Sequence, residues 1–488
     1  DGAGSGAAIV DALASISAVD LKVQDDLTVT DDASVGGNLT LTGNGDFNGD
    51  LDVDGTTETD ALTINGSALK YKAFGTSSIM FGDDATGTIS SADNNTGLGV
   101  DVFAALTEGD NNVAVGKSSL GAITTGTRNI AIGASAGDAI TTSTKNVVVG
   151  TAALTTNTTG DNNVAIGDQA LSDNSTASDN TAVGTSALGA NTTGASSVAV
   201  GSNALDANTT ASFNNAFGAN ALGANTTGAS NNAFGYNSLD ANTTGTQNSA
   251  FGHGALGTMA TASYNTGMGY RVLNASTTAQ ENAAFGTDAM LATTEGGRNA
   301  AFGAYALTSD TTGANNTAVG YISLGANTTG TQNTSLGYQA GDAITTGSMN
   351  AACTGNTNTV VGDSALAANT SGSDNTVVGA AAMNANTTGA SNTAIGRDAL
   401  DANTTADHNV AVGKEVLTTN TTGAQNTAAG NFALALNTTA SNNTAFGYSA
   451  LLSNTTGAQN TAVGNAAGDA ITTGSNNVAL GYEALGKS

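Results

Sequence analysis

The stretch from Asn214 to Gln247 decides the fold, because it contains one 17-residue unit twice. It reads NNAFGANALGANTTGAS to Ser230 and continues as NNAFGYNSLDANTTGTQ. The consensus N-x-A-φ-G-x-x-A-L-x-x-N-T-T-G-x-x, where φ is a large apolar residue, gives 24 unit starts from Asn95 onward, and one unit, at Asn350, has only eight residues. Position 1 is Asn in 23 of the 24 units, and position 5 is Gly in 23. A fixed period of this length predicts geometrically equivalent coils that stack on one another.

Positions 1 to 5 of the unit alternate as a β-strand does. Positions 2 and 4, as in Val164 and Ile166, share one face of the strand. We expect them to point into the coil with the Leu at position 9, and the Ala at position 3 to face an approaching sheet or chain. Helix is disfavoured because Asn, Thr and Gly recur and no 3.6-residue period persists. The sequence therefore predicts an all-β protein, an elongated parallel β-solenoid or β-roll of 17-residue coils.

Equivalent residues of successive coils are expected to form ladders along the inside of the stack. Aromatic side chains would lie above one another at position 4, asparagine amides would hydrogen-bond along positions 1 and 12, and glycine at position 5 would end each strand without a Cβ penalty. The predicted ladder residues are Phe217, Phe234, Phe251, Phe285, Phe302, Asn214, Asn231, Gly218 and Gly235.

The N-terminal section differs in composition from the coils. Residues 1–70 carry 13 acids against Lys22 and Lys70, a net charge of −11 out of −28 for the chain. Apolar residues spaced three and four apart favour a short helical, coiled-coil or linker segment over residues 1–20. A six-residue period then predicts a narrow hexapeptide-repeat β-helix over 21–70, whose thin interior favours sharing among three chains. Residues 71–94 form a transition to the 17-residue solenoid at 95–488, with its short unit at 350–357.

The charge and composition exclude several classes of function. The net charge of −28, with 11 basic residues, opposes binding to nucleic acid. One cysteine, Cys353, excludes an internal disulfide framework, and its short unit favours a local bulge over a thiol site. His253 and His408 lie about ten units apart, roughly 48 Å at strand spacing, so they cannot share a site within one chain. No catalytic motif occurs, uniform coils offer no deep pocket, and the chain is expected to be no enzyme and to need no cofactor.

Two weaker binding hypotheses remain open. The acidic cluster Asp46, Asp50, Asp52 and Asp54 is a candidate calcium site, although it lacks EF-hand spacing and a closing Glu, which favours a solvated acidic surface. Repeated Thr and Asn at strand spacing could also form an ice-binding face, a minor alternative. The exposed, variable positions 6, 7, 10 and 11 are the candidates for contact residues.

The repeat carries a resemblance to two kinds of surface fibre. NVAIG at Asn163–Gly167 and SVAVG at Ser197–Gly201 resemble the N-S-V-A-I-G motif of YadA-like heads in trimeric autotransporter adhesins. The form NTAVG from Asn460 with its flanks, and the hexad stretch LTVTDDASVGGNLTLTGNGDF, resemble phage tail-fibre-like virion proteins. The resemblance implies left-handed β-rolls assembled as trimers.

Together these features predict a homotrimeric structural fibre of a phage virion, a tail fibre or appendage that projects from the particle and attaches to the host surface. Its expected partners are itself, other virion proteins or a surface anchor, and a glycan or protein receptor on the host. The alternative is a trimeric surface adhesin or extracellular filament of a bacterium, located at the cell surface.

Overall fold

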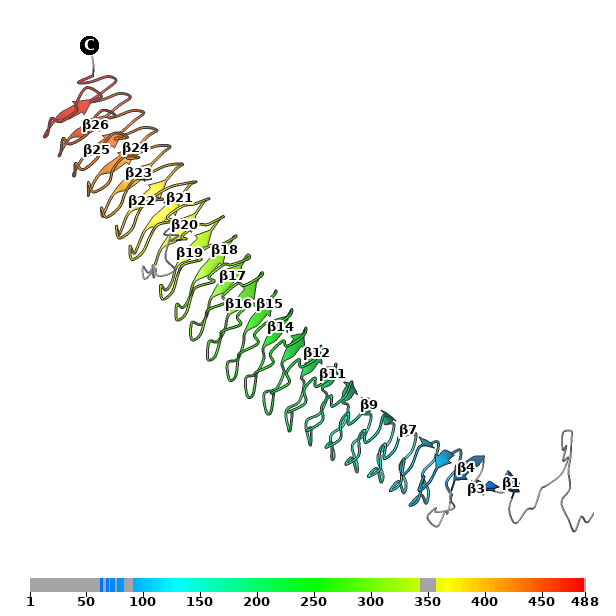
Figure 1. Ribbon diagram of the computed structural model, residues 1–488. Helices are drawn as coiled ribbons and strands as arrows, with labels where there is room; N and C mark the ends of the chain where they lie inside the picture. The colour runs from blue at the N-terminus through cyan, green and yellow to red at the C-terminus, as the bar shows by residue number, and fades with distance from the viewer. Residues whose placement is uncertain are drawn as a thin grey trace, which may run out of the picture. The chain divides into compact units, whose positions relative to one another are not determined.

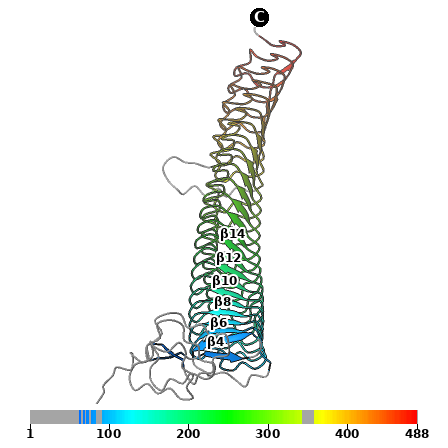
Figure 2. The ribbon, with the colours of Figure 1, turned by 90° about the vertical axis from the view of Figure 1, so that its right-hand side faces the viewer.

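A ladder of short parallel strands dominates the computed structural model, which describes residues 62–64, 67–69, 71–74, 77–82, 91–342 and 357–486. These residues form strands and turns and contain no helix. Each strand from β5 to β27 lies beside the strand one coil earlier, so successive coils stack face to face (Figures 1 and 2). The predicted parallel β-solenoid is confirmed, with about 22 coils of about 17 residues.

Each coil contributes one strand, which has four residues in β5 and three in the others. The strands are β5 (Thr96–Gly99), β6 (Val113–Val115), β7 (Ile130–Ile132), β8 (Val147–Val149), β9 (Val164–Ile166), β10 (Thr181–Val183), β11 (Val198–Val200), β12 (Asn215–Phe217), β13 (Asn232–Phe234), β14 (Ser249–Phe251), β15 (Thr266–Met268), β16 (Ala283–Phe285), β17 (Ala300–Phe302), β18 (Thr317–Val319), β19 (Thr334–Leu336), β20 (Thr359–Val361), β21 (Thr376–Val378), β22 (Thr393–Ile395), β23 (Val410–Val412), β24 (Thr427–Ala429), β25 (Thr444–Phe446), β26 (Thr461–Val463) and β27 (Val478–Leu480).

The strands that precede the ladder pair differently. β1 (Leu62–Ile64) and β2 (Ser67–Leu69) form a separate antiparallel pair. β3 (Tyr71–Phe74) is antiparallel to β4 (Ser78–Gly82), and β4 then pairs in parallel with β5. The ladder is open, because β3 has only β4 and β27 has only β26 as partners among the described residues. The segments predicted over residues 1–20 and most of 21–70 lie outside the described residues.

The orientation predicted for the strand side chains is wrong. The Ala at position 3 is fully buried inside the coil, as in Ala165 and Ala216, whereas positions 2 and 4 point outward. The interior is too thin for a larger group on both of its walls. At Gly267, which replaces the Ala at position 3, an added Cβ would already contact Leu256 of the neighbouring coil and Val272. The core is therefore Ala on one wall against Ala and Leu, at positions 8 and 9, on the other.

Glycine at position 5 is required both by its backbone and by the coil beside it. Gly235 has a φ of 144°, a conformation that L side chains rarely adopt. A Cβ at this site would also lie 2.5 Å from the carbonyl oxygen of Gly252 in the next coil. Both reasons hold at Gly218, whose φ is 135°. The near-invariance of this glycine follows from the close approach of successive coils.

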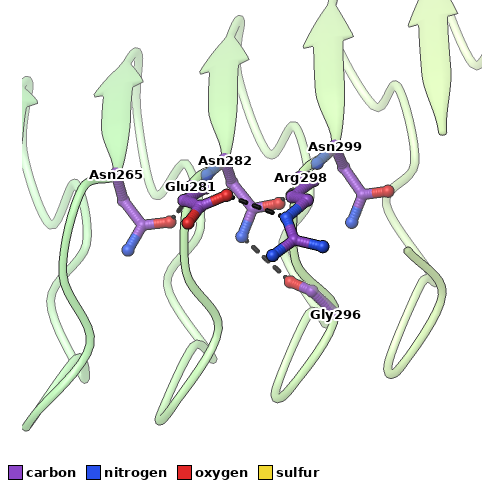
Figure 3. A network of polar contacts seen from close by, with 6 residues as sticks. All are labelled: Asn265, Glu281, Asn282, Gly296, Arg298 and Asn299. Atoms are coloured by element: carbon purple, nitrogen blue, oxygen red, sulfur yellow. Dashed lines mark hydrogen bonds and ion pairs between the residues drawn. The ribbon is translucent and has the colours of Figure 1, made fainter. Parts of the chain in front are cut away.

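Asparagine side chains hold the interior together in two columns. At position 1, Asn282 accepts the backbone N–H of Asn299 at 2.9 Å and donates to the carbonyl of Gly296 at 2.9 Å, while its own N–H donates to Asn265 (Figure 3). At position 12, Asn225 Nδ2 donates 3.0 Å to Asn208 Oδ1. These residues are fully or almost fully buried, so the amides satisfy backbone groups that the short strands leave unpaired.

One coil is longer than the rest. β19 pairs directly with β20, and the N–H of Asn358 donates to Asn333 Oδ1 at 3.1 Å, across 25 residues instead of 17. The ladder therefore passes directly from β19 to β20. Cys353 lies outside the described residues.

Candidate functional site

The outward side chains at position 4 form the most continuous surface feature of the described coils. This position is apolar in all 23 strands from β5 to β27, and position 2 carries no charged residue in any of them. In the single chain these side chains are exposed in 13 of the strands, as at Ile132 (42%) and Met268 (47%), and half-buried in the other ten. Parallel pairing in register places each one directly beside its counterpart in the next coil. Position 2, on the same side of the strand, is Thr, Ser or Asn in 14 of these strands and apolar in the other nine. We call the surface formed by positions 2 and 4 the outer apolar face, after its continuous apolar column at position 4.

Aromatic rings gather on part of the outer apolar face. Phe217, Phe234 and Phe251 stack with ring centroids 4.7 and 4.9 Å apart, and Phe285 stacks on Phe302 at 4.9 Å. These are the predicted ladder residues, but they lie outside the coil, because the inward side of these strands carries the small position-3 residue, as at Ala216 and Ala301. Phe234 therefore has a ring stacked on each of its two faces.

A second row of rings runs beside the first at position 6. Tyr236, His253 and Tyr270 lie in successive coils with centroids 5.2 and 5.4 Å apart. Tyr321 stacks on Tyr338 at 5.5 Å further along. The outer apolar face is therefore widened by aromatic side chains over its middle coils.

Charged side chains lie in the turns that flank the strands. Arg271 forms a 2.9 Å pair with Asp288, and hydrogen bonding to Asp288 raises the pKa of the guanidinium. Arg298 pairs with Glu281 at 2.9 Å and Arg397 with Glu415 at 3.2 Å. These pairs link successive coils at the surface without placing a charge on the outer apolar face.

A hollow of about 330 Å³ lies beside Asp342 and is lined also by Gln339, Ser364, Ala368 and Asn384. Asp342 Oδ1 accepts the N–H of Ala326 at 3.1 Å. Burial, opposed by that hydrogen bond, raises the pKa of Asp342 to about 6. Asp342 is the single acid among the described residues that line the hollow, whereas glycoside hydrolysis needs two carboxyl groups. The hollow therefore does not provide a hydrolytic pair.

The other residues singled out in the sequence are not brought together. His253 follows β14 and His408 precedes β23, with β15 to β22 between them. Asp46, Asp50, Asp52 and Asp54 lie outside the described residues. Positions 6, 7, 10 and 11 are exposed or half-buried in most coils, as in Tyr236 and Asn237, so they remain candidates for contact.

Sequence reasoning missed the outer apolar face because alternation shows which residues share a face, not which face points inward. A usable signal was side-chain volume. Position 3 is restricted to small residues in nearly every coil, which is typical of a wall in a narrow interior, while position 4 varies from Val to Phe. A position that tolerates such different volumes is not confined by close packing.

The described part of the chain contains no cluster of three or more His, Cys, Asp or Glu side chains that could hold a metal ion. Within the same residues, no helix is long and apolar enough to cross a membrane. No family model matches the chain, and no curated protein matches it.

Proposed function

We propose that this protein is a self-assembling structural fibre subunit, a homotrimer of a phage tail fibre or virion appendage that holds a host-contact surface away from the particle. The observation that carries the proposal is the outer apolar face: position 4 is apolar in every one of the 23 strands and points to solvent in the single chain. Assembly would bury this face, and repeated coils would supply length.

The size of the face supports assembly. The position-4 column alone, a strip about 5 Å wide along about 22 coils spaced about 4.8 Å apart, covers roughly 500 Å². Soluble monomers rarely expose contiguous apolar patches beyond a few hundred Å², and larger patches mark interaction surfaces. The absence of charged side chains at positions 2 and 4 of β5 to β27, in a chain of net charge −28, matches the depletion of charge in interface cores.

A second copy of the chain is the best-matched occupant. A partner must follow the face coil by coil with the same repeat distance, which identical chains do when they lie side by side in register. Symmetric association of identical chains is also the commonest form of oligomer. Three copies follow from the resemblance to trimeric fibres and from the thin hexapeptide β-helix predicted over residues 21–70.

The oligomeric state can be tested with charged substitutions on the outer apolar face of the full chain. Light scattering of the native protein should give the mass of three chains. Replacing Ile166, Val183 and Val200 together with Lys should lower the mass to one chain while the β circular dichroism is retained, because these side chains point away from the coil core. The matched control replaces Thr176, Thr193 and Thr210, the exposed position-14 residues of the same coils, with Lys.

The control should leave the three-chain mass intact. A native mass of one chain would remove the trimer, and equal effects of both triple variants would show that the outer apolar face has no special part in assembly.

The location on a virion needs its own test. Immunogold labelling with antibodies to the recombinant chain should decorate appendages of phage particles purified from the source culture. Labelling of bacterial envelopes without phage particles would favour the alternative, a bacterial surface adhesin or extracellular filament.

The minor alternative, ice binding, has one observation in its favour. Position 14 presents an exposed column of Thr along most coils, including Thr159, Thr176 and Thr193. Thermal hysteresis of the full chain at freezing would support it, and freezing behaviour equal to that of an unrelated protein would exclude it.

A further inference from the structure

The asparagine column at position 12 is interrupted in the middle of the solenoid. Asn runs through this position from Asn157 to Asn242, and then Met259, Ser276, Thr293 and Asp310 replace it in four consecutive coils before Asn327 resumes the column. All four replacements are fully buried. Ser276 Oγ, Thr293 Oγ1 and one carboxyl oxygen of Asp310, Oδ2, have no hydrogen-bond partner. A buried acid therefore stands where the fold otherwise uses a neutral amide.

The two carboxyl oxygens of Asp310 occupy different places. Oδ1 takes the part of an asparagine oxygen, because it accepts the N–H of Gly313 at 3.1 Å and the amide of Asn327 at 2.9 Å. Oδ2 takes the place of the amide nitrogen. The glycine at position 15 of the preceding coil serves as a common reference point for this comparison. A Cβ added to that glycine, Gly296, would lie 3.0 Å from Asp310 Oδ2. The corresponding Cβ at Gly228 would lie 2.9 Å from Asn242 Nδ2.

The position that Asp310 Oδ2 occupies needs a hydrogen-bond donor. In the regular column Asn225 Nδ2 donates both to the Oδ1 of Asn208 in the preceding coil and to the carbonyl of Gly228, at position 15 of its own coil. The equivalent neighbours of Asp310 are the Thr293 hydroxyl and the Gly313 carbonyl. An ionised carboxylate would set Oδ2 against the carbonyl oxygen of Gly313, which can only accept, whereas a proton on Oδ2 restores the missing donor.

We propose that Asp310 is a neutral carboxylic acid in the folded coil, that its Oδ2–H donates to Gly313 or Thr293 in place of an asparagine amide, and that its ionisation makes this coil a pH-sensitive joint in the solenoid. The inference is independent of the proposed function, because it concerns one interior position of a single chain.

The electrostatic setting agrees with a neutral acid. Burial raises the pKa of Asp310 to about 8, although the hydrogen bonds from Gly313 and Asn327 act to lower it, and no charged group contributes. The other titratable groups on its own coil and the two flanking coils are Asp288, Glu295, Arg298, Tyr305 and Tyr321.

The sign of the pH dependence follows. The folded coil holds a proton on Asp310 up to about pH 8, whereas the unfolded chain releases it near the ordinary value of 3.8. The contribution of this group to stability therefore falls as pH rises from about 4 to about 8, and it changes no further above that.

Hydrogen–deuterium exchange of the full chain, followed on peptides from residues 293–318, tests the proposal, because this range leaves out Ala326, whose N–H donates to the titrating Asp342. Exchange rates corrected for intrinsic pH dependence should rise at least tenfold between pH 6 and pH 9 in the native protein. Asp310→Asn, which restores the column, should abolish that rise and exchange more slowly at pH 9. Asp310→Ile gives a second test without a titratable group, because Ile123 and Ile140 occupy position 12 elsewhere. Asp173→Asn, at an exposed aspartate, is the control and should leave the rise unchanged.

A second readout identifies the proton itself. The infrared spectrum at pH 7 should contain a protonated carboxyl band that shifts in D₂O and is missing from Asp310→Asn. Absence of this band, or a pH response equal in Asp310→Asn and the native chain, would overturn the proposal. The proposal would also be wrong if Na⁺ or Ca²⁺ stabilised the native chain more than choline does and had no such effect on Asp310→Asn. The carboxylate would then hold a cation and not a proton.

Discussion

Positions 3 and 4 of each strand are neighbours in sequence, yet they lie in opposite surroundings. Ala216 at position 3 is fully buried between the walls of the coil, whereas Phe217 at position 4 is 37% exposed. The small side chain is inside and the large apolar one outside, which reverses the usual distribution of apolar volume. Inside the coil the small position-3 side chains pack against the Ala and Leu of positions 8 and 9 and buried asparagine amides satisfy the backbone, whereas the large position-4 side chains lie on the surface of the single chain.

The strongest test of this comparison removes an amide from the inside. Asn282→Ala would leave the N–H of Asn299 and the carbonyl of Gly296 buried without the partners they have now. At roughly 1–3 kcal/mol for each unsatisfied buried group, the local stability should fall by about 4 kcal/mol. Hydrogen–deuterium exchange of peptides from the coils on either side would measure the fall coil by coil. That readout suits stacked repeats, whose unfolding need not be two-state.

The matched control for this change is Thr278→Ala, which shortens an exposed side chain on the preceding coil. It should alter local exchange by less than about 0.5 kcal/mol, as surface substitutions usually do. Equal effects of Asn282→Ala and Thr278→Ala would contradict a structural role for the position-1 column.

The second test compares the same new residue on the two faces of one strand. Ala216→Leu adds three carbons to a wall where, at the equivalent Gly267, even a Cβ would contact Leu256. Overpacking of this kind should cost about 2 kcal/mol. Phe217→Leu, one residue later, should cost less in a single chain, because its side chain faces outward and loses only the ring contact with Phe234.

Thermal melting of the monomeric, charge-substituted chain would measure the two variants without the contribution of contacts between chains. A larger loss for Phe217→Leu than for Ala216→Leu in that background would show that position 4, and not position 3, is the packed position.

The period of the sequence was sufficient for the architecture but not for the orientation of its side chains. Asn at position 1 and Gly at position 5 repeat every 17 residues because each contacts its own equivalent in the next coil, so stacking was readable from Asn214 and Gly218. Whether Val164 or Ala165 points inward depends on the distance between the walls of the coil. That distance is set by turns in which position 9 adopts a positive φ, 53° at Leu171, and sequence periodicity carries no such information.

The length of the coil at Asn333 was equally beyond a local interpretation. The eight extra residues read as a unit of their own because they begin with Asn, but only strand pairing tells that β20 takes its place directly after β19. The substitution of Asp310 for Asn was visible in the sequence, whereas its meaning depends on burial and on which acceptors lie beside Oδ2.

The smallest expected effect lies on the outside, next to Asn282. Arg298 pairs with Glu281 at 2.9 Å, but their side chains are 69% and 50% exposed (Figure 3). Solvent and salt screen such pairs, and holding two long side chains costs entropy, so Arg298→Ala should lower local stability by about 0.5 kcal/mol or less. The loss should disappear in 1 M NaCl, whereas that of Asn282→Ala should persist, because no charge is involved. A salt-independent loss of about 2 kcal/mol for Arg298→Ala would show that surface pairs, and not only buried amides, hold successive coils together.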